Sequence, residues 1–364
     1  MSSLGIYIHV PFCAKKCAYC DFYSENYRKN TVSQYVEAVI RNLKAYSDKS
    51  RLTDTVYFGG GTPSLLSPEQ IKIILDTVEN NFVLSEKPEI TLETNPNTVN
   101  FNKLSEFRHA GINRLSIGVQ SMIDDELKFL GRTHSADRAE KAVIDAYRAG
   151  FENISCDVMI ALPNQSADSL EYTLDKITSL PIQHISGYIL KTESGTPFDC
   201  DEIKNSLPDD DLTAELYIKM TETLKNKGFQ QYEVSNFALK GFESRHNCRY
   251  WKCLDYIGIG PSAHSCNNGK RFAVERNLNE FISNEVQKVT ITDEHPCTFE
   301  EYAMLRLRLT EGLDLNAFPE HKDSILKKIP ALIKSGYINY NNDNISLTPN
   351  GFLVSNSVIE YLVF

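Results

Sequence analysis

The 364-residue sequence has no apolar run near the length of a membrane-spanning helix. Such a helix needs about 20 consecutive apolar residues. The first residues, MSSLGIYIHVPFC, also lack the basic start and the long apolar stretch of a secretory signal. These absences argue against a helical membrane anchor and against secretion, and they predict a cytoplasmic location.

Positive charge is scarce as well. The 38 Lys and Arg residues are outnumbered by 48 Asp and Glu, which gives a net charge of −10. General binding to a phosphate backbone needs a basic face, so we expect no nucleic-acid partner. The apolar content of 41% is that of an ordinary globular protein, and the length suffices for one large domain and one smaller domain.

Cysteine is present, but its pattern is not that of a disulfide framework. In a cytoplasmic protein, nine cysteines are expected to be free thiols or metal ligands. Three of them, Cys13, Cys17 and Cys20, lie within eight residues of each other. We expect the scattered others to pack as inert buried thiols, namely Cys156, Cys200, Cys248, Cys253, Cys266 and Cys297.

Short β-rich runs alternate with amphipathic helical stretches, for example Val32–Tyr46 and Ile71–Phe82, over the first two hundred residues. The predicted strands are Gly5–Val10, Thr55–Phe58, Glu89–Glu93, Arg114–Val119, Ile154–Met159 and Ile185–Leu190. Six such units predict an α/β fold with a parallel sheet, and they are too few for a complete eight-stranded barrel. We therefore expect a partial (β/α)6 barrel, with its chemistry at the carboxyl ends of the strands.

The sequence divides into three parts. Residues 1–235 hold the predicted barrel and its extension, including a last strand at Gln230–Val234. Residues 236–297 are irregular and rich in Gly, Cys and aromatics, so we interpret them as a linking segment. Residues 298–364 show two helices and then a hairpin over residues 337–348, which predicts a small winged-helix-like domain. Because Lys and Arg are not clustered there, we expect this domain to serve packing or docking.

The cysteine triplet follows directly after the first predicted strand. Most [4Fe–4S] clusters are held by four cysteines, so the spacing of Cys13, Cys17 and Cys20 would leave one iron open. The amino and carboxylate groups of S-adenosylmethionine (SAM) can bind that iron, and an electron from the cluster can then cleave the sulfonium to a 5′-deoxyadenosyl radical. A zinc site that recruits His9 and a set of unrelated thiols are the alternatives, although zinc normally takes four protein ligands.

A series of short motifs between residues 7 and 265 resembles those of a known protein family. The resemblance is carried, in order, by YIHVPFCAKKCAYCDFY, GGGTPSLLS, ETNP, RLSIGVQS, LGRTH, DVMIALP, QQYEVSNFA, HNCRYW and DYIGIGPSAHS. The chain resembles the radical SAM superfamily. More narrowly, it is similar to the oxygen-independent coproporphyrinogen III oxidases and their relatives, the HemW-type haem chaperones.

The resemblance implies a set of SAM-binding residues. Gly60, Gly61 and Thr62 match the loop at the methionine end of SAM, and Glu93 matches the ligand of the ribose hydroxyls. Other matching positions near one or two SAM sites are Tyr7, Tyr19, Gln120, Arg132 and Asp157. The alternatives are structural: Glu93 could cap a helix, and Arg132 could form an ion pair with Asp157.

Two features separate the chaperones from the oxidases near the cluster. Phe22 stands where the oxidases carry a further cysteine, and the chain reaches Cys13 without the N-terminal extension of the oxidases. Both features favour the chaperones.

The third feature is a haem motif. His246, Tyr250 and Trp251 match the HNxxYW signature, so the resemblance implies His246 as a haem ligand, with a basic cluster of Arg245, Arg249 and Lys252 for the propionates. His246 could instead be a hydrogen-bonded structural residue, or it could share another metal site with Cys248 and Cys253.

The sequence therefore predicts a haem chaperone that binds haem, SAM and a [4Fe–4S] cluster and transfers haem to an acceptor protein. An electron donor of the flavodoxin or ferredoxin type is the second expected partner. The resemblance also leaves room for a membrane-associated acceptor and for a homodimer. The alternative function is the oxidase (dehydrogenase) reaction on coproporphyrinogen III in porphyrin biosynthesis.

Overall fold

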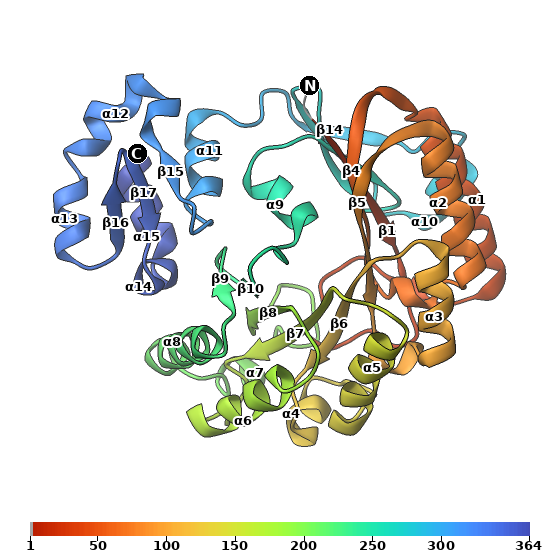
Figure 1. Ribbon diagram of the computed structural model, residues 1–364, viewed down its shortest axis with the longest axis horizontal. Helices are drawn as coiled ribbons and strands as arrows, with labels where there is room; N and C mark the ends of the chain where they lie inside the picture. Colours follow the sequence, from red (N-terminus) through yellow and green to blue (C-terminus); the bar gives the residue numbers. More distant parts are fainter. Residues whose placement is uncertain (1–2) are drawn as a thin grey trace.

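The protein is built on a twelve-stranded sheet with helices along its outer face (Figure 1). The structure, a computed structural model, describes residues 3–364. Six neighbouring strands run parallel, in chain order: β1 (Leu4–Val10), β4 (Asp48–Gly60), β5 (Phe82–Thr94), β6 (Arg114–Gln120), β7 (Ile154–Ile160) and β8 (His184–Ile189). The predicted partial barrel and its six strands are confirmed.

The crossover helices follow the strands and cover the outside of the sheet (Figure 1). They are α1 (Lys29–Ala45), α2 (Pro68–Asn81), α3 (Phe101–Ala110), α4 (Asp124–Phe129), α5 (Ala136–Arg148) and α6 (Ala167–Thr178). After β8, the last parallel strand, α8 (Asp210–Asn226) packs beside α6, and the short α7 (Asp201–Lys204) belongs with the cluster of apolar residues that includes Tyr19. Every residue of β6 is buried, because a parallel sheet is enclosed on both faces. Helix α2 begins with a capping box, in which Ser67 Oγ accepts from the Gln70 N–H and the Ser67 N–H donates to Gln70 Oε1.

The predicted linking segment, residues 236–297, contributes strands to both edges of the sheet. Its strands are β10 (Asn236–Ala238), β11 (Tyr256–Ile259), β12 (His264–Asn267), β13 (Lys270–Val274) and β14 (Val289–Asp293). β11 pairs in parallel with β1 at one edge, and β10 pairs antiparallel with β8 at the other. These strands are short and glycine-interrupted, so they lack the long apolar runs that identified the first six. The strand expected at Gln230–Val234 is only β9 (Gln230–Gln231).

The C-terminal domain has the predicted helices and hairpin. It comprises α11 (Phe299–Arg306), β15 (Leu313–Asp314), α12 (Pro319–Leu326), α13 (Ile329–Lys334), β16 (Ile338–Asn341), β17 (Asn344–Leu347), α14 (Pro349–Leu353) and α15 (Ser355–Val363). The second expected helix is divided in two near Pro330, which removes a backbone donor. Asn342 and Asp343 form the hairpin turn with φ of 50° and 60°.

Two short strands and two further helices complete the fold: β2 (Phe12–Cys13), β3 (Glu25–Asn26), α9 (Arg245–Trp251) and α10 (Leu278–Ser283). Within residues 3–364, no helix combines the length and the apolar character that a bilayer crossing requires.

Candidate cluster and cofactor site

A cavity of about 430 Å³ opens at the carboxyl ends of the parallel strands. Its wall contains all the site residues predicted from the sequence except Tyr7 and His246, namely Cys13, Cys17, Tyr19, Cys20, Gly60, Gly61, Thr62, Glu93, Gln120, Arg132 and Asp157. The fold thus brings together side chains from five strands and the cysteine loop. It also adds residues that the sequence reasoning missed, among them Asn95 and Tyr188, for which position at a strand end was the only signal, and Ser116 within β6.

The cysteine loop lies at the mouth of this cavity. All three thiols are half-buried and free of disulfides. Thr62 Oγ1 donates to Cys13 Sγ over 3.6 Å, and Arg132 Nη1 donates to Cys17 Sγ over 3.4 Å. Both donors are directed at sulfurs that a cluster in this loop would use as ligands. The loop therefore fits a three-cysteine cluster.

The zinc alternative fits poorly. His9, the expected fourth ligand, uses one ring nitrogen on Tyr7 Oη (3.1 Å) and the other on the Tyr23 carbonyl (2.9 Å). Across residues 3–364, no three His, Cys, Asp or Glu side chains form a group able to hold one metal ion. A cubane cluster has no such requirement, because it distributes its thiolates over separate iron atoms.

The glycine loop after β4 is pressed against the cysteine strand. The Gly60 N–H donates to Glu93 Oε2 (3.2 Å), and the Thr62 N–H donates to the Phe12 carbonyl (2.7 Å). Gly60 has a φ of 107°, and a Cβ on Gly61 would lie 2.7 Å from the Phe12 carbonyl oxygen. Only glycine permits both the conformation and the approach. The backbone of this loop therefore forms one wall of the cavity.

Glu93 lies at the end of β5 and does not cap a helix. Its Oε1 accepts from Tyr57 Oη (2.8 Å), and its Oε2 accepts from the Gly60 N–H. Burial raises the pKa of Glu93 to about 7, and the nearby Asp157 adds to the rise. Glu93 thus presents a carboxyl group whose charge changes near neutral pH.

Arg132 and Asp157 each bond to neighbours of their own, in place of the ion pair considered above. Arg132 Nη2 donates to the Gly118 carbonyl (2.9 Å), and Asp157 Oδ1 accepts from Ser116 Oγ (2.9 Å). Arg132 Nε is buried and has no acceptor among the described residues. An unpaired guanidinium N–H in the wall suits an anionic or oxygen-bearing ligand.

Gln120 ends β6 with a φ of 69°, next to a register shift between β6 and β7. Such irregularities re-aim a side chain at the end of a strand, here at the cavity.

Tyr7 lies outside the residues that line the cavity wall. Its hydroxyl bonds to His9, and its ring stacks on Tyr57 and His246, with centroids 6.1 and 6.3 Å apart. Since Tyr57 bonds to Glu93, Tyr7 is one layer away from the cavity and supports its floor.

His246 is a buried core residue in this structure, and the expectation that it ligates haem stays a prediction. Its side chain has no exposed area, its Nδ1 bonds to Thr55 Oγ1 (2.8 Å), and its Nε2 bonds to Tyr250 Oη (2.9 Å). Ligation of haem iron would therefore require one ring nitrogen to exchange its hydroxyl partner for the metal. Burial lowers the pKa of His246 to about 3, so the imidazole is neutral.

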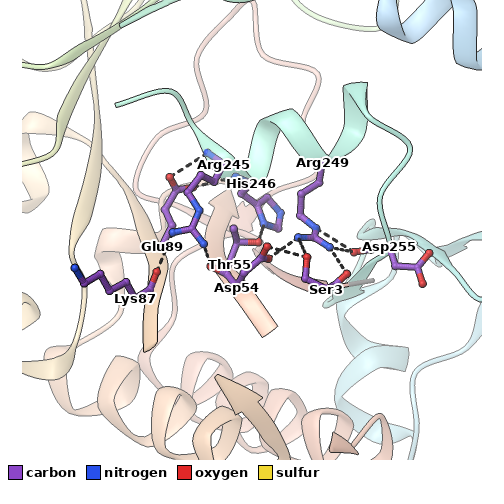
Figure 2. Close-up of polar contacts among 9 residues, drawn as sticks. All are labelled: Ser3, Asp54, Thr55, Lys87, Glu89, Arg245, His246, Arg249 and Asp255. Atoms are coloured by element: carbon purple, nitrogen blue, oxygen red, sulfur yellow. Dashed lines mark hydrogen bonds and ion pairs between the residues drawn. The ribbon is translucent and has the colours of Figure 1, made fainter. Parts of the chain in front are cut away.

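The basic cluster beside it is also used internally (Figure 2). Arg249 is buried, forms an ion pair with Asp54 and donates to the Asp255 carbonyl from Nε (3.0 Å). Arg245 donates to the carbonyls of Lys87 and Asp54. Lys252 pairs with Glu311, so no member of the expected propionate patch is unpaired.

Helix α9, which carries the HNxxYW motif, closes the barrel at the end opposite the cavity. Glu89 accepts from the N–H groups of Arg245 and His246, both over 3.0 Å (Figure 2). Thr55 and Glu89 precede the cavity residues Gly60 and Glu93 along the same strands. The motif is therefore separated from the cluster loop by the interior of the barrel.

Comparison with known proteins agrees with this arrangement. The family model described as Radical SAM superfamily matches residues 7–177, and the HemN C-terminal domain matches residues 298–354. The heme chaperone HemW of Escherichia coli (strain K12) is 34% identical over 98% of this chain and 97% of its own length. The chain belongs to the HemW family of radical SAM proteins. Membership implies SAM and a [4Fe–4S] cluster as its cofactors.

Other relatives extend the comparison. The mitochondrial radical S-adenosyl methionine domain-containing protein 1 of Danio rerio is 38% identical to this HemW-family chain over 85% of the chain and 73% of the relative. The solved structure of coproporphyrinogen III oxidase (HemN) from Escherichia coli covers 100% of this chain and 90% of its own, with a TM-score of 0.82 at 21% identity. This likeness shows that the two proteins share a fold.

Proposed function

We propose that this protein is a haem chaperone that carries a SAM-liganded [4Fe–4S] cluster and passes haem to an acceptor protein. The observation that carries the proposal is its similarity to HemW over nearly the whole length of both chains. The convergence of the cysteine loop, the glycine loop and Glu93 on one cavity supports the cofactor part.

In this proposal Cys13, Cys17 and Cys20 hold the cluster, while Arg132 and Thr62 stabilise the thiolates by donating to their sulfurs. The reduced cluster supplies the electron that cleaves SAM when both are bound. The protein's part is to position SAM and to exclude water from the cavity.

The family resemblance supplies the orientation of SAM in this cavity. The backbone of Gly60, Gly61 and Thr62 would hold the methionine end, and the carboxyl oxygens of Glu93 would accept from the ribose hydroxyls. Tyr19, Gln120, Arg132 and Asp157 line the remaining wall, where a second SAM could also bind.

The cluster loop suits an acidic redox partner. Lys15 and Lys16 are exposed between the first two cluster cysteines, and both line the mouth of the cavity. Two lysines at this edge favour docking of a flavodoxin- or ferredoxin-type donor through opposite charge.

Haem titration of the cluster-loaded protein, followed by absorbance, tests the proposal. We expect saturable haem binding and no catalytic turnover when coproporphyrinogen III, SAM and a reductant are supplied. Catalytic release of protoporphyrinogen would establish the oxidase function instead. A protein that neither binds haem nor turns over would refute the chaperone.

The variant His246→Gln identifies the role of the motif. Because His246 is bonded internally, we expect the variant to bind haem with the wild-type affinity and spectrum. A folded variant that loses the haem spectrum would reinstate His246 as the ligand.

A further inference from the structure

The chain segment between β9 and β10 lies on the side of the barrel that faces the C-terminal domain (Figure 1). The main chain of residues 232–234 pairs there with that of residues 308–310. Glu233 forms a β-bridge with Leu309, and one N–H···O bond of 3.0 Å flanks the bridge on each side. We call this pairing the junction, because it joins the barrel directly to the C-terminal domain.

The same segment also reaches the wall of the cofactor cavity. The Gly187 N–H of β8 donates to the Ser235 carbonyl (2.7 Å), two residues after Glu233. Tyr188, the residue that follows Gly187, lines the cavity. A change at the junction is therefore only a few bonded residues away from the cofactor site.

Glu233 is enclosed at the junction without a hydrogen-bond partner. It is 1% exposed, and neither of its carboxyl oxygens has a partner among the described residues. Arg308, the cation that faces it, donates instead to Ser355 Oγ (3.0 Å) and to Asn356 Oδ1. A carboxylate that is buried without partners is strongly destabilised when it is ionised. The closed junction therefore favours the neutral acid.

The other groups around Glu233 do not change charge near neutral pH. They are Tyr188 of β8, Tyr217 of α8, Tyr232 of the same segment and Cys248 of α9, and burial raises the pKa of each of them. Arg308 stays charged, because an arginine side chain keeps its proton in a protein. Glu233 is thus the group whose charge can vary at this place.

We propose that Glu233 is a protonation switch for the junction, which is closed while this carboxyl is neutral and opens when the carboxyl ionises. Opening breaks the bridge to Leu309 and its two flanking hydrogen bonds, and the carboxyl proton passes to solvent. The strand segment that holds Gly187 beside the cavity then loses its support from the C-terminal domain.

The direction of the pH effect follows from the two states of Glu233. Burial raises its pKa from the ordinary 4.5 to about 7 in the closed junction, and contact with water restores the ordinary value in the open one. Between these values the open form is ionised and the closed form keeps its proton. Opening is therefore favoured about tenfold for each pH unit in this range, and the effect levels off above pH 7, where both forms are ionised.

Hydrogen exchange of the full-length, cluster-loaded protein tests the proposal. Peptides that cover residues 231–236 and 307–312 contain the Val234 and Thr310 amides, whose hydrogen bonds break when the junction opens. Protection factors remove the intrinsic pH dependence of exchange. From pH 5 to pH 7.5 we expect the protection of both amides to fall by up to about a hundredfold. A peptide from the buried strand β6 reports global opening and should not show this fall.

Glu233→Gln is the informative variant, because its side chain stays neutral at every pH. Its junction should keep the protection that wild type has at pH 5 throughout the series. Glu311→Gln is the matched control, since Glu311 is an exposed carboxylate close to the junction that pairs with Lys252 and Arg306. This control should retain the fall in protection as the pH rises.

Two results would overturn the proposal. The first is junction protection in wild type that stays constant between pH 5 and pH 7.5, and the second is an equal fall in wild type and in Glu233→Gln. If Glu233→Gln does not fold, the wild-type series decides alone: a fall confined to the two junction peptides supports the switch, and a constant protection removes it.

Discussion

At the scale of single residues, Glu93 is the carboxyl through which we expect pH to act on SAM binding. Burial, with Asp157 nearby, raises the pKa of its carboxyl to about 7, so the group is largely protonated below that pH. Hydroxyl donors favour the charged carboxylate, so SAM should bind the deprotonated form. We predict that SAM affinity increases severalfold between pH 6 and pH 8, as measured by calorimetry on cluster-loaded protein.

In Glu93→Gln the SAM affinity should fall about tenfold, because the substitution removes roughly one charge-assisted hydrogen bond. The pH dependence of the affinity should disappear as well. Glu193→Gln is the matched control, because Glu193 is an exposed carboxylate on the same cavity. An unchanged pH slope in Glu93→Gln would show that another group is responsible.

His246 should influence stability, and its effect depends on pH. Burial, together with Arg249 and Arg114, lowers its pKa from 6.5 to about 3. Between pH 7 and pH 5 the unfolded chain gains a proton on this imidazole while the folded protein does not. The free energy of unfolding should therefore decrease by about 2 kcal/mol between pH 7 and pH 5.

Urea unfolding at the two pH values measures this loss. His246→Gln retains hydrogen-bonding groups but cannot titrate, so its stability should decrease less from pH 7 to pH 5. His295→Gln removes an exposed histidine and is the control. Equal losses in wild type and His246→Gln would mean that His246 does not titrate on unfolding.

At the scale of elements, the fastening of α9 depends on Glu89. Its two carboxylate oxygens accept the N–H groups of Arg245 and His246, which have no helical partners at the start of a helix. Glu89→Gln removes the charge and leaves one donor unpaired, which should cost about 1–3 kcal/mol. Hydrogen exchange of the amides of residues 245–251 should accelerate by about tenfold or more, as this free energy implies.

The control is Glu86→Gln, since Glu86 is exposed on the same strand. Unchanged exchange in Glu89→Gln would show that packing of the helix, and not its carboxylate cap, holds α9 in place.

The elements also show what a sequence can and cannot reveal. The six parallel strands were predictable because each is a buried apolar run, and the cavity because Gly60, Glu93 and Gln120 end such runs. The environment of helix α9 was not predictable, since its motif shows only a histidine beside aromatic and basic residues. Only the tertiary fold reveals that Thr55 and Tyr250 bond to the two ring nitrogens of His246.

At the scale of the whole molecule, the C-terminal domain is joined to the barrel by main-chain hydrogen bonds. The Val234 N–H donates to the Arg308 carbonyl, and the Thr310 N–H donates to the Tyr232 carbonyl, both over 3.0 Å. Glu233 lies between them, almost fully buried, and burial raises its pKa to about 7. Removing the domain would leave these groups exposed without their partners.

Every residue that lines the cofactor cavity lies between Cys13 and Glu193, well before this domain. A protein ending at residue 297 should therefore still bind the cluster and SAM, but with a lower free energy of unfolding. Iron content, SAM affinity and urea unfolding, compared with the full chain, measure the two effects separately. If the shortened protein keeps its circular dichroism but cannot bind the cluster, the C-terminal domain contributes to the cluster site itself. A loss of stability alone would reduce the circular dichroism signal and cluster binding together.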